Sequence, residues 1–272
     1  MIPRIGQLRR REFLGALGAA AAWPLTARAQ QGKVARIGFL GLDSAQGHAP
    51  RLAALRAGLH ELGWIEGRNI TVEFRWADGN YSRLPMLAAD LVELNVDVIV
   101  THGAAGALAA KSATSTIPIV ITAVSDMLGL GLAESLSRPA GNLTGLSVFS
   151  AELMAKRVEL AKEAVPSLTK VAVLLNPDNS ANRLILPETL SIAKSLNVEL
   201  RAFEARQPSD FEPTFAAMAN QQIGALVVHE DNMLVTNAKA LAVLAAEGRL
   251  PTCGFPELVR SGGPACLRHQ FS

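Results

Sequence analysis

Small and polar residues follow most of the short apolar runs in this sequence, and they are the residues that could do chemistry. Together they offer hydroxyls, amides, carboxylates and the backbone N–H groups of Gly/Ala loops. Backbone donors suit a ligand carboxylate, and Asp126 or Asp231 could hold an ammonium. We therefore predict a site for an amino acid or a similar small zwitterion at Ser44, His102, Gly103, Ala104, Ala105, Ser125, Asp126, Asn176, Asn179 and Asp231.

Two other readings of the polar residues are less well supported. Asp43, Ser44 and His102 are the residue types of a hydrolase, but no Gly-x-Ser-x-Gly elbow occurs and no Ser-Asp-His order is tied to strand ends. The His-Glu-Asp run at 229–231 could bind a metal or transfer protons, but neighbouring residues of a strand point to opposite faces. We therefore expect no catalytic residue and no metal ligand, and predict that the protein is not an enzyme.

No motif indicates a bound cofactor. Gly38, Gly41 and Gly47 follow the first apolar run, but their spacing is not Gly-x-Gly-x-x-Gly, and no Walker A motif occurs. Cys253 and Cys266 are the only cysteines, and neither has a second Cys or a His at zinc-site spacing. We expect no cofactor, no metal site and no disulfide framework.

The elements that position the predicted site are clearest in the stretch 95–126. A β-branched run at 96–101 is followed by a small-residue loop at 102–105, an alanine-rich helix at 106–115 and a second β-branched run at 118–124. This order is a βαβ unit, so the two strands should be parallel and adjacent. Ligands bind beyond the carboxyl ends of such strands, so these two ends would form half of a cleft.

The same alternation continues along the chain. Further strands are expected at 34–41, 70–76, 143–149, 170–176, 198–204, 225–229 and 252–255, and further helices at 50–62, 81–94, 131–137, 151–165, 181–196, 209–220 and 237–247. The strand at 70–76 alternates apolar and charged residues, which predicts a place near a sheet edge. The fold class predicted is α/β, with two Rossmann-like parallel-sheet lobes and an interlobe cleft.

Three local features complete this prediction. The buried stripe of helix 50–62 is expected to run from Leu52 to Leu62. Arg157 is expected on the water-facing side of helix 151–165, and Ser209 is the candidate N-cap of helix 209–220.

The amino end has the parts of an export signal. Arg9-Arg10-Arg11-Glu12-Phe13-Leu14 contains a twin-arginine pattern, the run 14–22 is weakly apolar, and Ala27-Arg28-Ala29 is an A-x-A cleavage site. The apolar run is too short to span a bilayer. We predict a signal peptide of the twin-arginine type at residues 1–30, cleaved near Ala29, and a periplasmic protein.

Composition limits the possible partners. The net charge is +2 and aromatic residues make up 5% of the 272 residues, so the chain has neither a basic field nor stacking platforms for nucleic acid. At 49% hydrophobic residues the chain can bury a large core and form two domains. A small molecule is therefore the expected partner, and nucleic acid is not.

Several longer stretches carry a family resemblance. They include VARIGFLG at 34–41, GWIEGRNITVEFRWADG at 63–79, ALAAKSATSTIPIV at 107–120, ESLSRPAGNLTGLSVFS at 134–150 and RLPTCGFPELVRSGG at 249–263. From residue 34 to 263 the chain resembles ABC-transporter substrate-binding proteins with the type 1 periplasmic-binding fold, in the branch of tryptophan/tyrosine-type uptake. The loop after residue 124 departs from the family's usual Asp-Pro and reads Ser125-Asp126-Met127.

The resemblance implies a mechanism and domain limits. A ligand would be trapped between an N-terminal lobe at 33–149 and a C-terminal lobe at 150–258, and a monomer would deliver it to an inner-membrane permease and ATPase. Residues 259–272 depart from the family's usual return strand, so we expect a truncated or frameshifted return segment there. An envelope enzyme acting on a small metabolite is the alternative. The ligand stays open among amino acids, aromatic acids and other small solutes.

Overall fold

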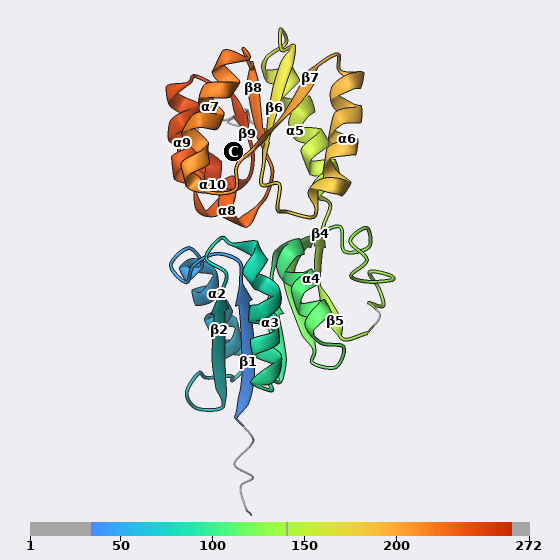
Figure 1. The fold of residues 1–272 in the computed structure, drawn as a ribbon, viewed down its shortest axis with the longest axis vertical. Coiled ribbons are helices and arrows are strands. Elements are labelled where there is room, and N and C mark those ends of the chain that lie inside the picture. The colour runs from blue at the N-terminus through green and yellow to red at the C-terminus, as the bar shows by residue number, and fades with distance from the viewer. Residues whose placement is uncertain (1–33, 140, 263–272) are drawn as a thin grey trace, which may run out of the picture. The chain divides into compact units, whose positions relative to one another are not determined.

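The computed structural model describes residues 34–139 and 141–262, which contain two parallel β-sheets. The strand order is β2-β1-β3-β4-β5 in the first sheet and β7-β6-β8-β9 in the second (Figure 1). Both sheets belong to one compact unit that begins at Ala35. The predicted α/β class with two parallel-sheet lobes is confirmed. The predicted signal peptide lies outside the described residues.

The first lobe is built from alternating strands and helices around the five-stranded sheet. Its elements are β1 (Ala35–Gly41), α2 (Ala49–Glu61), β2 (Ile70–Trp76), the 3-10 turn η1 (Tyr81–Arg83), α3 (Leu84–Glu93), β3 (Val98–Thr101), α4 (Gly103–Ala113), β4 (Ile119–Ser125) and β5 (Leu143–Val148). β2 is an edge strand, as its alternating pattern predicts.

Helices cover both faces of the first sheet. Leu52 of α2 packs with Ile37 and Phe39 of β1 on one face. Ile99 and Ile119 point to the opposite face, where α3 and α4 lie side by side (Figure 1). Successive residues of a strand alternate between faces, and β-branched residues suit a strand covered on both sides. The small side chains of α4 are good helix formers and leave room for close packing on the sheet.

The second lobe repeats the pattern around the four-stranded sheet. Its elements are α5 (Ser150–Ala164), β6 (Lys170–Leu175), α6 (Asn182–Ser195), β7 (Glu199–Glu204), the 3-10 turn η2 (Pro208–Asp210), α7 (Phe211–Asn220), β8 (Ala225–Val228), α8 (Asn232–Thr236), α9 (Ala238–Glu247), β9 (Thr252–Cys253) and α10 (Pro256–Arg260). Helices α5 and α6 lie on one side of this sheet and α7 and α9 on the other (Figure 1). All residues of β8 are buried, as expected for a central strand.

The loop predicted at 102–105 is instead the start of a helix. α4 begins at Gly103, so Gly103, Ala104 and Ala105 form its first turn rather than a loop. Gly103 enters the helix at φ +68°, a conformation that favours glycine, and the alanines that follow have high helix propensity. The prediction assigned these small residues to a loop, whereas here they allow an early helix start.

The helix predicted at 131–137 is wrong, because this segment consists of turns and bends. Gly131 has φ +69°, and its N–H bonds to the carbonyl of Leu128 in a turn. Lys111 from α4 donates to the carbonyl oxygens of Gly131 and Leu132 at 2.6 and 3.2 Å. In a helix, these carbonyl oxygens would accept hydrogen bonds from the following turn. Here they accept from Lys111 instead, and these bonds hold an irregular segment against α4.

Three local predictions also fail for identifiable reasons. Leu62 is 78% exposed, because α2 ends at Glu61 and the chain turns at Gly63. Arg157 is buried rather than water-facing, since it pairs with a carboxylate of the second lobe. Ser209 lies inside η2, and Gln207 caps that turn in its place.

Within residues 34–139 and 141–262, no helix has the length and apolar character needed to cross a bilayer.

Gly145 in β5 should tolerate no side chain. Its φ is +156°, and a Cβ there would collide with the carbonyl oxygen of Ile121, next to a register irregularity between β4 and β5. We expect Gly145→Ala to lower the free energy of unfolding by about 2 kcal/mol or more, measured by urea denaturation. Gly58→Ala is the matched control, because a Cβ at Gly58 in α2 meets nothing within 4 Å. It should be neutral or stabilise by about 0.5–1 kcal/mol, and equal losses in both variants would contradict this reading.

Candidate functional site

A cavity of about 540 Å³ lies where the carboxyl ends of strands from both sheets meet. The volume is within the range of small-molecule sites, roughly 300–1,000 Å³. Its walls are largely apolar, and its polar groups come from the loops and helix ends that follow the strands. Of the ten residues predicted from the sequence, seven line this cavity: His102, Gly103, Ala104, Ala105, Ser125, Asn179 and Asp231.

The amino end of α4 forms part of the first-lobe wall. Gly103, Ala104 and Ala105 are its first residues, and all three line the cavity. The first N–H groups of a helix have no partner within the helix, and the helix dipole places partial positive charge there. His102 as N-cap makes no side-chain capping bond to these groups. The wall therefore offers backbone donors suited to a carboxylate.

Asp231 has a different surrounding from the one predicted. Its Oδ1 accepts from Asn176 Nδ2 at 3.3 Å and from Met233 N at 3.0 Å. Its Oδ2 accepts from the Tyr81 hydroxyl and from Asn179 Nδ2, each at 3.1 Å. Burial raises the pKa of Asp231 to about 6, while the hydrogen bonds act in the opposite direction. Four protein donors thus hold a buried carboxylate that joins the two lobes through Tyr81.

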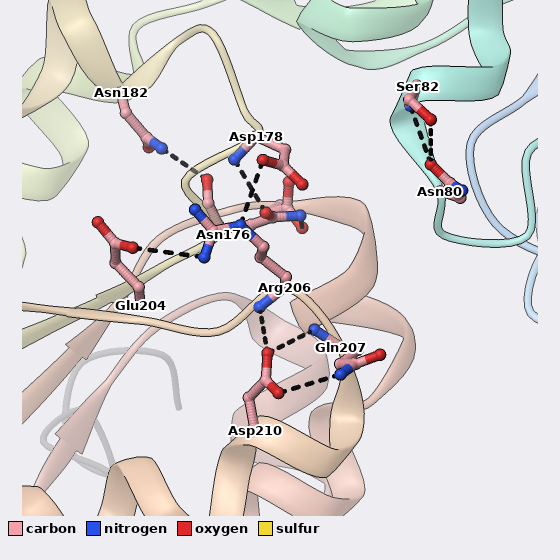
Figure 2. Close-up of polar contacts among 10 residues, drawn as sticks. Asn80, Ser82, Asn176, Asp178, Asn182, Glu204, Arg206, Gln207 and Asp210 are labelled. Carbon is pink, nitrogen blue, oxygen red and sulfur yellow. Dashed lines mark hydrogen bonds and ion pairs between the residues drawn. The ribbon is translucent and has the colours of Figure 1, made fainter.

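Asn176 supports this arrangement from behind the wall. It is buried and does not line the cavity. Its Oδ1 accepts from Asp178 N at 3.1 Å and its carbonyl oxygen accepts from Asn182 Nδ2 at 2.6 Å, as Figure 2 shows. Because its amide also donates to Asp231, Asn176 fixes the loop after β6 and orients the neighbouring carboxylate.

Ser44 and Asp126 stay outside the lining of the cavity. Both are exposed and bond within their own loops. The Ser44 hydroxyl accepts from Gly47 N at 3.3 Å, and Asp126 Oδ1 accepts from Gly129 N at 2.9 Å. Ser125, beside Asp126, does line the cavity, and its hydroxyl accepts from Ser150 at 2.8 Å.

A histidine pair lies in the first-lobe wall. His48 Nε2 and His102 Nε2 are 2.8 Å apart, so one ring donates and the other accepts. His48 also packs 5.3 Å from the Trp76 ring, between ring centroids. Burial lowers the pKa of His102 to about 3, and burial also lowers that of His48. Both imidazoles are therefore neutral near pH 7 and add a largely apolar surface.

Two ion pairs connect with the cavity. Arg157 Nη2 is 2.7 Å from Oε1 of Glu230, which lines the cavity. Arg51 and Glu257, both in the lining, face each other at 3.9 Å and are about half exposed. In the part of the chain that the structure describes, no group of three His, Cys, Asp or Glu residues could hold a metal ion.

Sequence reasoning missed several wall residues. His48, Arg51 and Tyr81 follow the strand ends by several residues and belong to helices or helix starts. Tyr81 is the only tyrosine of the sequence and begins a predicted helix after a strand, which is a signal that could have found it. Glu230 was considered only as part of a metal or acid/base run.

A sequence model of one protein family matches residues 44–271. Its description is "ABC transporter substrate binding protein". This chain belongs to that family. The match covers most of the chain and confirms the resemblance predicted from the quoted stretches.

Individual relatives agree with this membership. The chain is 29% identical over 209 residues to a curated "Tyrosine-binding protein" of Clostridioides difficile, covering 76% of this chain and 60% of the relative's length. A solved structure of a conserved domain protein from Vibrio cholerae has 28% identity and a TM-score of 0.76, covering 85% of this chain and 77% of that one. An ABC domain from Streptococcus pneumoniae in complex with L-Trp has 22% identity and a TM-score of 0.73, covering 84% and 77%. Members of the family are binding proteins rather than enzymes.

Acid should weaken the fold partly through His102. Its pKa is about 6.5 in an unfolded chain and about 3 when folded, so below pH 6.5 the unfolded chain binds a proton that the folded chain does not. The stability that neutral His102 contributes is full above about pH 6.5 and falls by up to about 1.4 kcal/mol per pH unit below it. We expect the Tm of the wild type to drop more than that of His102→Gln between pH 7 and 5. His60→Gln, on exposed α2 surface, should follow the wild type, and parallel pH curves for all three would contradict the assignment.

The Tyr81 hydroxyl should stabilise the protein through Asp231. Tyr81→Phe removes one of the four donors and leaves Asn179 on Oδ2, so we expect a loss of about 1–2 kcal/mol in urea denaturation. A double-mutant cycle with Asp231→Asn isolates the pair, because contacting residues give non-additive effects. Additive losses would show that the hydroxyl acts elsewhere.

Proposed function

We propose that this protein captures an aromatic amino acid in the cavity between its two lobes and delivers it unchanged to an ABC importer. The cavity itself carries the proposal, since it combines apolar and aromatic walls with backbone donors at one helix start and with carboxylates. The tyrosine-binding relative supports an aromatic amino acid, as does the neighbour solved with L-Trp.

Each part of such a ligand has a suitable surface in the cavity. The α4 amino end at 103–105 would take the carboxylate, because its N–H groups are unpaired within the helix. Phe39 and Phe255 would pack against the aromatic ring. Of the residues predicted from the sequence, we propose His102, Gly103, Ala104, Ala105, Ser125, Asn179 and Asp231 as wall contacts and Asn176 as a supporting residue.

Export and transport partners belong to the same proposal. Residues 1–30 would act as the twin-arginine signal, and the protein would work as a monomer in the periplasm. Lobes at 33–149 and 150–258 would close on the ligand and present it to a permease and an ATPase in the inner membrane. Family membership supports these partners. The chain spans 60% of the length of the curated relative that supports the ligand class.

A thermal-shift panel tests the proposal. L-Tyr, L-Trp and L-Phe should raise the Tm, because a ligand that binds only the folded state at 100 times its Kd adds about 2.7 kcal/mol. For a protein of about 150–250 residues this corresponds to roughly 5–10 °C. Mass spectrometry after overnight incubation should recover each ligand unchanged.

A matched pair of variants locates the binding. Ala54 and Ala53 are neighbouring exposed residues of α2, but only Ala54 lines the cavity. Ala54→Trp should abolish the ligand-induced shift by filling the cavity, and Ala53→Trp should preserve it. Equal responses from both variants, or no shift with any aromatic amino acid, would reject the proposed site or ligand class.

A further inference from the structure

Glu230 is a carboxylate of the cavity wall that forms an ion pair with a buried arginine. It lies two residues after the end of β8, lines the cavity, and its side chain is 32% exposed. Arg157, whose residue is only 8% exposed, donates from Nη2 to Oε1 of Glu230 at 2.7 Å and from Nη1 to the carbonyl of Val228 at 3.4 Å. A nearly buried guanidinium on α5 therefore holds one oxygen of a carboxylate at the cavity wall.

The second oxygen of Glu230 is the available acceptor. Among the residues that the structure describes, no donor bonds to Oε2 of Glu230. Asp231 next to it differs, because four protein donors already bond to its two oxygens. Of these two adjacent carboxylates, only Glu230 can accept a ligand donor without losing a protein bond.

We propose that Glu230, positioned by Arg157, makes the site select ligands that carry a primary ammonium over deaminated acids with the same side chain. The inference rests on the proposed function and specifies the ligand class of the same site. A charge-assisted bond from the ammonium to Oε2 would complete the hydrogen bonding of Glu230. A deaminated acid would cover Oε2 without offering a donor, and an ionised group removed from water without a partner is costly.

Arg157 is a positioning residue in this account. It does not line the cavity, but its bond to Oε1 limits the rotation of the Glu230 side chain. Removing Arg157 alone would leave a carboxylate without its partner, so a single substitution there would mix folding and binding effects.

Titration calorimetry of matched ligand pairs tests the inference. The pairs are L-Trp with indole-3-propionate and L-Tyr with 3-(4-hydroxyphenyl)propionate, measured on the wild type and on Glu230→Gln. Glutamine keeps the shape and an oxygen for Arg157 but removes the charge. We expect the wild type to prefer each amino acid by about tenfold or more, equivalent to about 1.4 kcal/mol. The preference should fall by about tenfold in Glu230→Gln, mainly through weaker amino-acid binding.

The controls separate this inference from the proposed function. Glu159→Gln removes a carboxylate of α5 that lies outside the cavity lining and pairs with Lys156, and it should keep the wild-type preference. If Glu230→Gln folds poorly, the double variant Arg157→Met/Glu230→Met replaces the whole pair with apolar side chains, which proteins often tolerate. It should also lose the preference.

The outcomes are distinct. If the wild type binds none of the four compounds, the proposed function fails and the inference with it. If the wild type prefers the amino acids and Glu230→Gln keeps that preference, the inference alone is overturned. A wild type that binds both members of each pair equally also overturns it, while aromatic ligand capture stands.

Discussion

A carboxylate that leaves water needs hydrogen bonds from the protein, and Asp231 obtains four of them from separate parts of the chain. Two come from the loop after β6, one from the start of α8 and one from Tyr81 in the first lobe. The loops after β6 and β8 are therefore fixed relative to each other. Since the cavity wall is made of these loops, its shape depends on the state of this one buried group.

Other polar residues of the cavity wall also bond to partners within the protein. The two imidazoles of His48 and His102 share one hydrogen bond and are both neutral, so the surface around them stays uncharged. Arg157 brings a charge into the second lobe but meets Glu230 and a backbone carbonyl there. In the described residues, the buried side-chain polar atoms without a hydrogen-bond partner are His48 Nδ1, the Ser180 hydroxyl and both ring nitrogens of His229. A wall of this kind can discriminate among ligands by their donors and acceptors.

Much of this fold could be predicted from the sequence, because its determinants are local. The β-branched run of β3, the alanines of α4 and the charged alternation of β2 each depend on neighbouring residues. The strand-end rule then placed seven of ten predicted residues in the cavity wall. Ser44 and Asp126 failed because a short polar side chain after a strand can equally bond to its own loop.

The features that could not be predicted from the sequence depend on contacts between residues that are distant in the chain. Arg157 looks like a surface residue on helical periodicity alone, and only the packing of α5 against β8 gives it Glu230. The segment after Gly131 has residues that suit a helix, but Lys111 takes the carbonyls. Tyr81 was expected only as the start of helix 81–94, and the tertiary fold brings Asp231 beside its hydroxyl. Sequence patterns report periodicity, whereas these contacts depend on tertiary structure.

The bond between Tyr81 and Asp231 spans 150 positions of the chain, and the bond from Thr236 to Asp43 spans 193. Strand pairings such as β3 with β4 close within about a single βαβ unit. Closing loops of this length costs entropy, so these contacts need other interactions in both lobes to offset that cost. Neither lobe alone contains the four donors of Asp231, and a complete cavity wall therefore requires both lobes to be folded.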